Sequence, residues 1–84
     1  MSKRVLLVED EPDLNETISF NLDSEGYEVT STFNGKDALN AIEKKKPDLI
    51  LLDLMLPDMS GLEICRELRS SKNTIKIPIM MVSA

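Results

Sequence analysis

One charged side chain, Asp53, interrupts the otherwise apolar stretch LILLDLMLP at residues 49–57. A buried carboxylate without a partner costs several kcal/mol of folding free energy, so its position needs a physical reason. A strand that leaves the core at Asp53 supplies that reason, because the carboxylate then lies at the carboxyl end of the strand. Ligands of open α/β sheets bind at this end. Asp53 is therefore a candidate functional residue.

Strand-like runs recur on both sides of this stretch, and together they occupy residues 3–8, 27–32, 48–52 and 76–82. Three of these runs are continuously apolar, which predicts strands in the interior of a sheet with both faces covered. The run at 27–32 alternates and is rich in β-branched residues, which predicts an edge strand. Helical segments separate the runs, so the order βαβαβαβ predicts a parallel α/β sheet with right-handed crossovers.

The helical segments begin and end at recognisable capping signals. Pro12 suits a first turn, Asp13 and Glu16 have capping-box spacing, and Gly26 marks the C-terminal end of the first helix. A second capping box, Ser60 with Glu63, begins the third helix. The side chains expected to face the sheet are Leu14, Ile18 and Leu22, then Ala38, Leu39 and Ile42, then Leu62, Cys65 and Leu68.

Composition restricts the chemistry. The chain has 84 residues, 42% of them hydrophobic, which suits one small domain. The formal net charge of −5 argues against the nucleic-acid backbone as a direct partner. The absence of histidine and the single Cys65 exclude a zinc site, a histidine-based triad and an internal disulfide. We find no N-terminal targeting signal and no run near the roughly 18 apolar residues of a membrane span, so we expect a cytoplasmic protein without membrane contact.

Acidic residues end two of the apolar strands. Glu9 and Asp10 follow the first strand, and Asp53 follows the third. If these strands are neighbours, the three carboxylates converge, and like charges this close need a proton or a cation. Mg²⁺ prefers oxygen ligands of this kind, and a carboxylate beside it can act as a nucleophile that forms an aspartyl-phosphate. Ser83 ends the fourth strand on the same rim and could donate to a phosphoryl oxygen.

These motifs resemble a known family. The combination of VEDE at 8–11, DLILLDLMLPDMSG at 48–61 and Ser-Ala at 83–84 is similar to the receiver domain of bacterial two-component response regulators, in particular those of the winged-helix transcription-factor subfamily. The resemblance implies a flavodoxin-like fold with strand order 2-1-3-4. It also implies a signalling module that is phosphorylated by a histidine kinase and that is not a turnover enzyme beyond slow self-dephosphorylation.

The resemblance also implies roles for individual residues. Asp53 would be the phosphoacceptor and Ser83 the switch hydroxyl, next to the small Ala84. The Mg²⁺ ligands would be Asp10, Asp53 and the backbone carbonyl of Met55, with Glu9 acting through water.

One departure from the family pattern has a physical consequence. A complete receiver domain continues with a fourth helix, a fifth strand ending in a lysine and a fifth helix, so residues 1–84 would be a partial domain with the first four strands and three helices. The fourth strand would then expose an apolar edge, which favours pairing with another chain. We expect a second copy or a missing C-terminal segment to cover it. DNA contact would require an output domain outside these residues.

Alternative interpretations remain at this stage. A haloacid-dehalogenase-type phosphohydrolase also uses an aspartate after a strand, but it needs a second aspartate where this chain has Met55. A non-phosphorylated half-domain that self-assembles through its open strand is the other alternative. Glu11 and Asp13 are interpreted as helix-start charges, Asp58 as a turn residue and Cys65 as a core residue.

Overall fold

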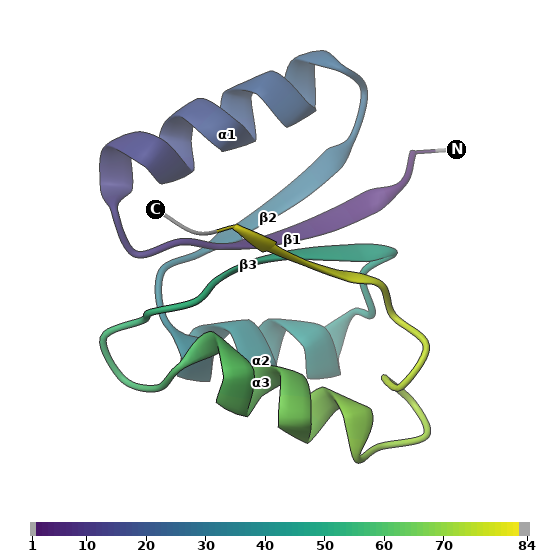
Figure 1. The fold of residues 1–84 in the computed structure, drawn as a ribbon. Coiled ribbons are helices and arrows are strands. Elements are labelled where there is room, and N and C mark those ends of the chain that lie inside the picture. Colours follow the sequence, from purple (N-terminus) through teal and green to yellow (C-terminus); the bar gives the residue numbers. More distant parts are fainter. Residues whose placement is uncertain (1, 83–84) are drawn as a thin grey trace.

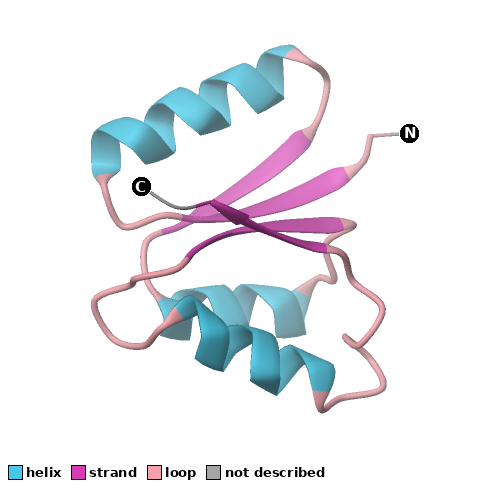
Figure 2. Cartoon of the chain, viewed as in Figure 1, coloured by secondary structure: helices cyan, strands magenta, loops and turns pink. Residues whose placement is uncertain are grey.

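The computed structural model describes residues 2–82, in which strands and helices alternate along the chain (Figure 2). Their bounds are β1 (Arg4–Val8), α1 (Pro12–Ser24), β2 (Glu28–Thr32), α2 (Gly35–Lys44), β3 (Leu49–Asp53), α3 (Gly61–Arg69) and β4 (Ile79–Val82). All strands are parallel and lie in the order β2-β1-β3-β4. This confirms the predicted fold class and strand order. Within the described residues, no helix is both long enough and apolar enough to cross a membrane.

The two edge strands of the sheet are less buried than its two central strands. β2 lies at one edge, as its alternation predicted, and β4 lies at the other. The apolar run 76–82 is therefore not an interior strand, and β4 begins only at Ile79. Ile77 belongs instead to a turn, where its amide donates to the Thr74 carbonyl at 3.1 Å, and its side chain is buried in the core. Met80 and Met81 are exposed at this edge.

Side-chain alternation divides the core into two layers. α1 covers one face of the sheet, and α2 and α3 cover the other (Figure 1). Even-numbered positions of the central strands, such as Leu6 and Leu52, pack with α2 and α3. Odd-numbered positions, such as Leu7 and Leu51, pack with α1. Successive side chains of a strand point to opposite faces, so both layers are filled by runs that show no polar alternation.

Helix ends follow local capping rules with one exception. Ser60 and Glu63 form the predicted capping box at the start of α3. Gly26 adopts a φ of +93° after α1, where a side chain would be strained, and it ends the helix as predicted. The capping box predicted for Asp13 with Glu16 is wrong, because Pro12 is the first helical residue and no side chain caps this end. Pro12 removes one of the amides that would need a partner.

The inner face of α3 differs by one position from the predicted one. Ile64 and Leu68 are buried, whereas Leu62 is 58% exposed, so the prediction for Leu62 is wrong. Gly61 lies against the Asp53 carbonyl so closely that a Cβ atom would overlap it. Gly61, Ile64 and Leu68 therefore share the buried face of α3. Cys65 is partly buried, and its thiol lies 3.8 Å from the Met81 sulfur.

Candidate functional site

The register of the sheet brings three carboxylates together. Val8 pairs with Leu52, so the residues that follow them, Glu9 and Asp53, lie side by side at the carboxyl ends of β1 and β3. Oxygen atoms of Glu9, Asp10 and Asp53 all lie within 4.8 Å of one another. The predicted convergence of the first and third strands is therefore confirmed.

The three carboxylates have different surroundings. Glu9 and Asp53 are buried, with 4% and 7% of their surface exposed, and Asp10 is exposed. An oxygen of Glu9 accepts a hydrogen bond from the Glu11 amide at 2.9 Å, and Oδ1 of Asp53 accepts one from the Met55 amide at 3.3 Å. Among residues 2–82, no lysine or arginine forms an ion pair with these carboxylates. The site therefore concentrates negative charge without a protein cation to offset it.

Burial and neighbouring charge both oppose ionisation of the Glu9 carboxyl and raise its pKa. Burial raises the pKa of Glu9, and the hydrogen bond from the Glu11 amide partly opposes this shift. The neighbouring charges of Asp53 and then Asp10 raise the pKa of Glu9 further. A proton or a divalent cation would relieve the repulsion.

We predict that Glu9→Gln stabilises the fold when no divalent cation is present. The pKa of Glu9 is higher in the folded than in the unfolded chain, so its ionised form costs folding free energy at neutral pH. This cost is relieved as the pH falls through the raised pKa. In EDTA at pH 7, the variant should melt a few degrees higher than the wild type, and the advantage should shrink by pH 5.

Thermal unfolding followed by circular dichroism at both pH values tests this prediction. Glu16→Gln, at an exposed position beyond the first turn of α1, is the matched control and should leave the melting temperature nearly unchanged. A lower melting temperature for Glu9→Gln at pH 7 would contradict the electrostatic account.

The donor set fits a hard divalent cation. Carboxylate oxygens are the ligands that Mg²⁺ and Ca²⁺ use, and Mg²⁺ usually takes one or two of them and keeps several waters. Asp10 is exposed, so water and a further ligand can reach the cluster from its side. The nearby Met55 side chain is 78% exposed and leaves this approach open.

Asn15 holds the backbone of this site, and sequence reasoning did not identify it. It lies in α1 and is only 2% exposed. Its amide nitrogen donates to the carbonyls of Glu9 at 3.0 Å and Thr32 at 3.1 Å, which are at the carboxyl ends of β1 and β2. The spacing 15, 18, 22 along α1 could have identified Asn15 as an inward-facing residue, because it lies on the same helix face as Ile18 and Leu22.

The loop after β3 is a compact turn. The Gly61 amide donates to the Leu54 carbonyl at 2.7 Å, and Met55 forms a β-bridge with Ser60. Asp58 at its tip is more than a turn residue, because its carboxylate accepts hydrogen bonds from the first amides of α2. Ser83, the predicted switch hydroxyl, and Ala84 lie outside the described residues.

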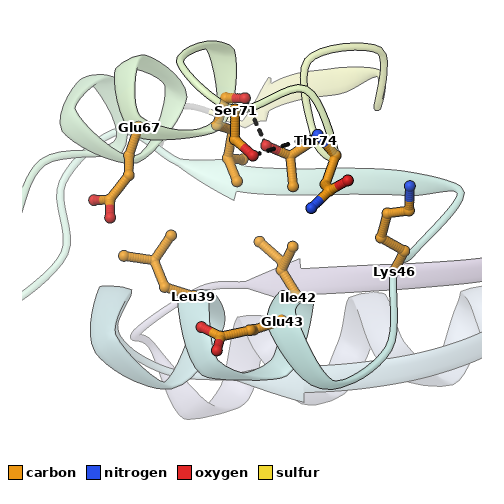
Figure 3. A pocket seen from close by; sticks show the side chains of 9 residues that line it. Leu39, Ile42, Glu43, Lys46, Glu67, Ser71 and Thr74 are labelled. Carbon is orange, nitrogen blue, oxygen red and sulfur yellow. Dashed lines mark hydrogen bonds between the residues drawn. The ribbon is translucent and has the colours of Figure 1, made fainter.

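A separate cavity of about 590 Å³ lies between the C-terminal halves of α2 and α3 (Figure 3). Leu39, Ile42 and Leu68 supply apolar side chains to its lining, and Glu43 and Lys46 supply charged ones. None of its lining residues belongs to the carboxylate cluster. We therefore place the candidate site at the carboxylate cluster and not at this cavity.

Comparisons with known proteins show the family and the fold of this chain. The family model of the response regulator receiver domain matches residues 5–84. The alkaline phosphatase synthesis transcriptional regulatory protein PhoP of Bacillus subtilis (strain 168) is 42% identical over the whole chain. The chemotaxis response regulator CheY4 of Vibrio cholerae superposes with a TM-score of 0.93 at 31% identity, covering 96% of this chain and 68% of that one.

A further solved structure contains a metal ion. The receiver domain of a sensor histidine kinase from Pseudomonas aeruginosa PAO1, with magnesium coordinated in its active site cleft, has a TM-score of 0.91 and 36% identity, covering 96% of this chain and 66% of that one. The chain spans about a third, 34%, of the length of the Bacillus relative.

Proposed function

Because this chain belongs to the response regulator receiver domain family, we propose that it accepts a phosphoryl group on Asp53 from a histidine kinase in a reaction that needs Mg²⁺. The observation that carries this proposal is the convergence of Glu9, Asp10 and Asp53, with carboxylate oxygens within 4.8 Å of one another. A signalling module controlled by phosphorylation needs these carboxylates, which explains why the fold retains charges that repel one another. It is a phosphoacceptor in two-component signal transduction, not a turnover enzyme.

In this proposal, Asp10, Asp53 and the backbone carbonyl of Met55 would hold the cation, and Glu9 would support it through water. The bound Mg²⁺ would neutralise charge on the phosphoryl oxygens as they are transferred. Asp53 and Glu9 are buried, so they present their oxygens from a fixed frame. Their backbone is fixed by strand pairing and by Asn15.

The phosphoryl transfer uses Asp53 as the nucleophile. A carboxylate oxygen of Asp53 forms a bond to phosphorus while the bond from phosphorus to the donor nitrogen breaks, and that nitrogen takes up a proton. The Met55 amide donates to Oδ1 of Asp53, and no described residue donates to Oδ2, which leaves that oxygen available for attack. We assign the Ser83 hydroxyl to the phosphoryl group as a donor after transfer.

The wider role follows the family. Residues 1–84 supply the first four strands and three helices of the receiver domain, and any DNA contact is made by an output domain outside them. The module acts in the cytoplasm, and a second copy or a following segment covers the β4 edge where Met80 and Met81 are exposed.

Phosphoramidate, a small phosphoryl donor, tests the proposal with this chain. Incubation with Mg²⁺ should add the mass of one phosphoryl group, read by intact mass spectrometry, and EDTA should prevent the addition. The reason is that the acidic cluster repels an anionic donor until a cation offsets its charge.

The absence of a phosphoryl adduct under both conditions would overturn the proposed function. It would favour the alternative of a non-phosphorylated scaffold that assembles through its β4 edge. An adduct that forms equally well in EDTA would leave phosphorylation in place and remove the metal requirement.

A further inference from the structure

Asp58 connects the loop after β3 to the start of α2. Its carboxylate oxygens accept hydrogen bonds from the Gly35 amide at 2.8 Å and the Lys36 amide at 2.9 Å. The first amides of a helix have no partner within the helix, and a negative charge at this end is favoured by the helix dipole. The local cap, Asn34, reaches only the Asp37 amide, at 2.8 Å. Two capping residues, one local and one distant in sequence, therefore accept hydrogen bonds from the free amides at the start of α2.

An apolar contact reinforces this connection. Met59, next to Asp58, packs on the α2 and α3 side of the core. It approaches Gly35 so closely that a Cβ atom at that position would overlap the Met59 side chain. Two adjacent loop residues therefore contact the first turn of α2: Asp58 through hydrogen bonds and Met59 through apolar packing. A shift of the loop would disturb both contacts.

The other end of the same loop carries the proposed metal site. The Met55 amide donates to Oδ1 of Asp53, and the bridge between Met55 and Ser60 closes the loop into a small ring. The hydrogen bonds from the Gly35 and Lys36 amides lower the pKa of Asp58, which favours its charged form. The carboxylate cluster and the cap on α2 are thus joined by the single loop that follows β3.

We infer that Asp58 is a positioning residue that couples cation binding at the carboxylate cluster to the order of the first turn of α2. The inference rests on the proposed function, because it takes the cluster as a cation site. Coupling between two sites is reciprocal. A cation at Asp10 and Asp53 should therefore strengthen the cap on α2, and a lost cap should weaken cation binding by the same factor.

Amide hydrogen exchange measured by NMR tests the coupling. In the wild-type chain, saturating Mg²⁺ should slow exchange at the Gly35 and Lys36 amides by about fivefold, the lower end of ordinary coupling between sites. Asp58→Asn keeps one acceptor oxygen but loses the charge and the second acceptor. In this variant the slowing should disappear, and the Mg²⁺ dissociation constant, read from amide shifts, should rise about fivefold.

Asp48→Asn is the matched control. Asp48 is also an exposed aspartate that accepts a backbone amide, that of Arg4 at 2.7 Å, but it lies at the amino end of β3. A general loss of stability would change both variants alike, and the weaker Mg²⁺ binding expected only in Asp58→Asn separates positioning from loss of the cap alone. The Asp48 variant should keep the Mg²⁺-dependent protection of α2.

The outcomes separate this inference from the proposed function. If Mg²⁺ binds the wild-type chain but leaves exchange at Gly35 and Lys36 unchanged, the coupling is overturned and the proposed function stands. If Asp58→Asn shows wild-type protection and affinity, the role of Asp58 is overturned. If the wild-type chain does not bind Mg²⁺ at all, both fall. The wild-type comparison decides the matter even if the variant does not fold.

Discussion

Asp53→Asn should abolish Mg²⁺-dependent phosphoryl labelling of this chain, lowering it by at least about 100-fold. The substitution replaces a nucleophilic carboxylate oxygen by a neutral amide of almost the same shape. Its remaining oxygen can still accept from the Met55 amide, as Oδ1 of Asp53 does at 3.3 Å, so the local fold should be retained. Intact mass spectrometry after incubation with phosphoramidate measures the effect, and circular dichroism checks the fold.

Two further variants make this result specific. Asp48→Asn removes an exposed carboxylate at the opposite end of β3 and should be labelled like the wild type. Asp10→Ala leaves the nucleophile in place and should need at least about tenfold more Mg²⁺ for the same labelling, because it removes a proposed ligand. Retained labelling in Asp53→Asn would refute the assignment of the acceptor. An unchanged Mg²⁺ requirement in Asp10→Ala would remove Asp10 from the metal site.

The position of the carboxylate cluster could be predicted because it depends on the topology of the sheet. Continuous apolar strands separated by helices predict parallel pairing, and the family resemblance implied the strand order 2-1-3-4, which makes β1 and β3 neighbours. Glu9 and Asp53 also continue the odd-numbered positions of their strands, which point toward α1.

Asp58 and Asn15 could not be assigned in the same way, because their partners are distant in the sequence. Asp58 bonds to amides 22 and 23 residues away, and Asn15 bonds to the Thr32 carbonyl 17 residues away. The turn-rich sequence at 57–61 accounted for an aspartate at position 58, so it gave no reason to expect a contact between Asp58 and α2. The error at Leu62 has another origin, because the buried face of α3 begins at Gly61, which has no side chain to mark that face in the sequence.

Asn15→Leu should destabilise the fold by about 1–3 kcal/mol. Asn15 is 2% exposed, and its amide nitrogen donates to the Glu9 and Thr32 carbonyls. Leucine has a similar volume but donates nothing. The Thr32 carbonyl would retain its bond from the Glu9 amide at 3.1 Å, so the main cost falls on the Glu9 carbonyl, which loses a donor next to the carboxylate cluster. Urea unfolding measures the loss as a lower midpoint with an unchanged slope.

Asn21→Leu provides the comparison that isolates this effect. Asn21 lies in the same helix, but on its exposed side, so the same chemical change there should alter the unfolding free energy by no more than about 0.5 kcal/mol. If both leucine variants unfold at the same urea concentration, Asn15 does not hold the strand ends. If Asn15→Leu alone is destabilised and also binds Mg²⁺ more weakly, the amide that joins α1 to the ends of β1 and β2 also supports the site. The backbone of Glu9 would then be the element shared by folding and metal binding.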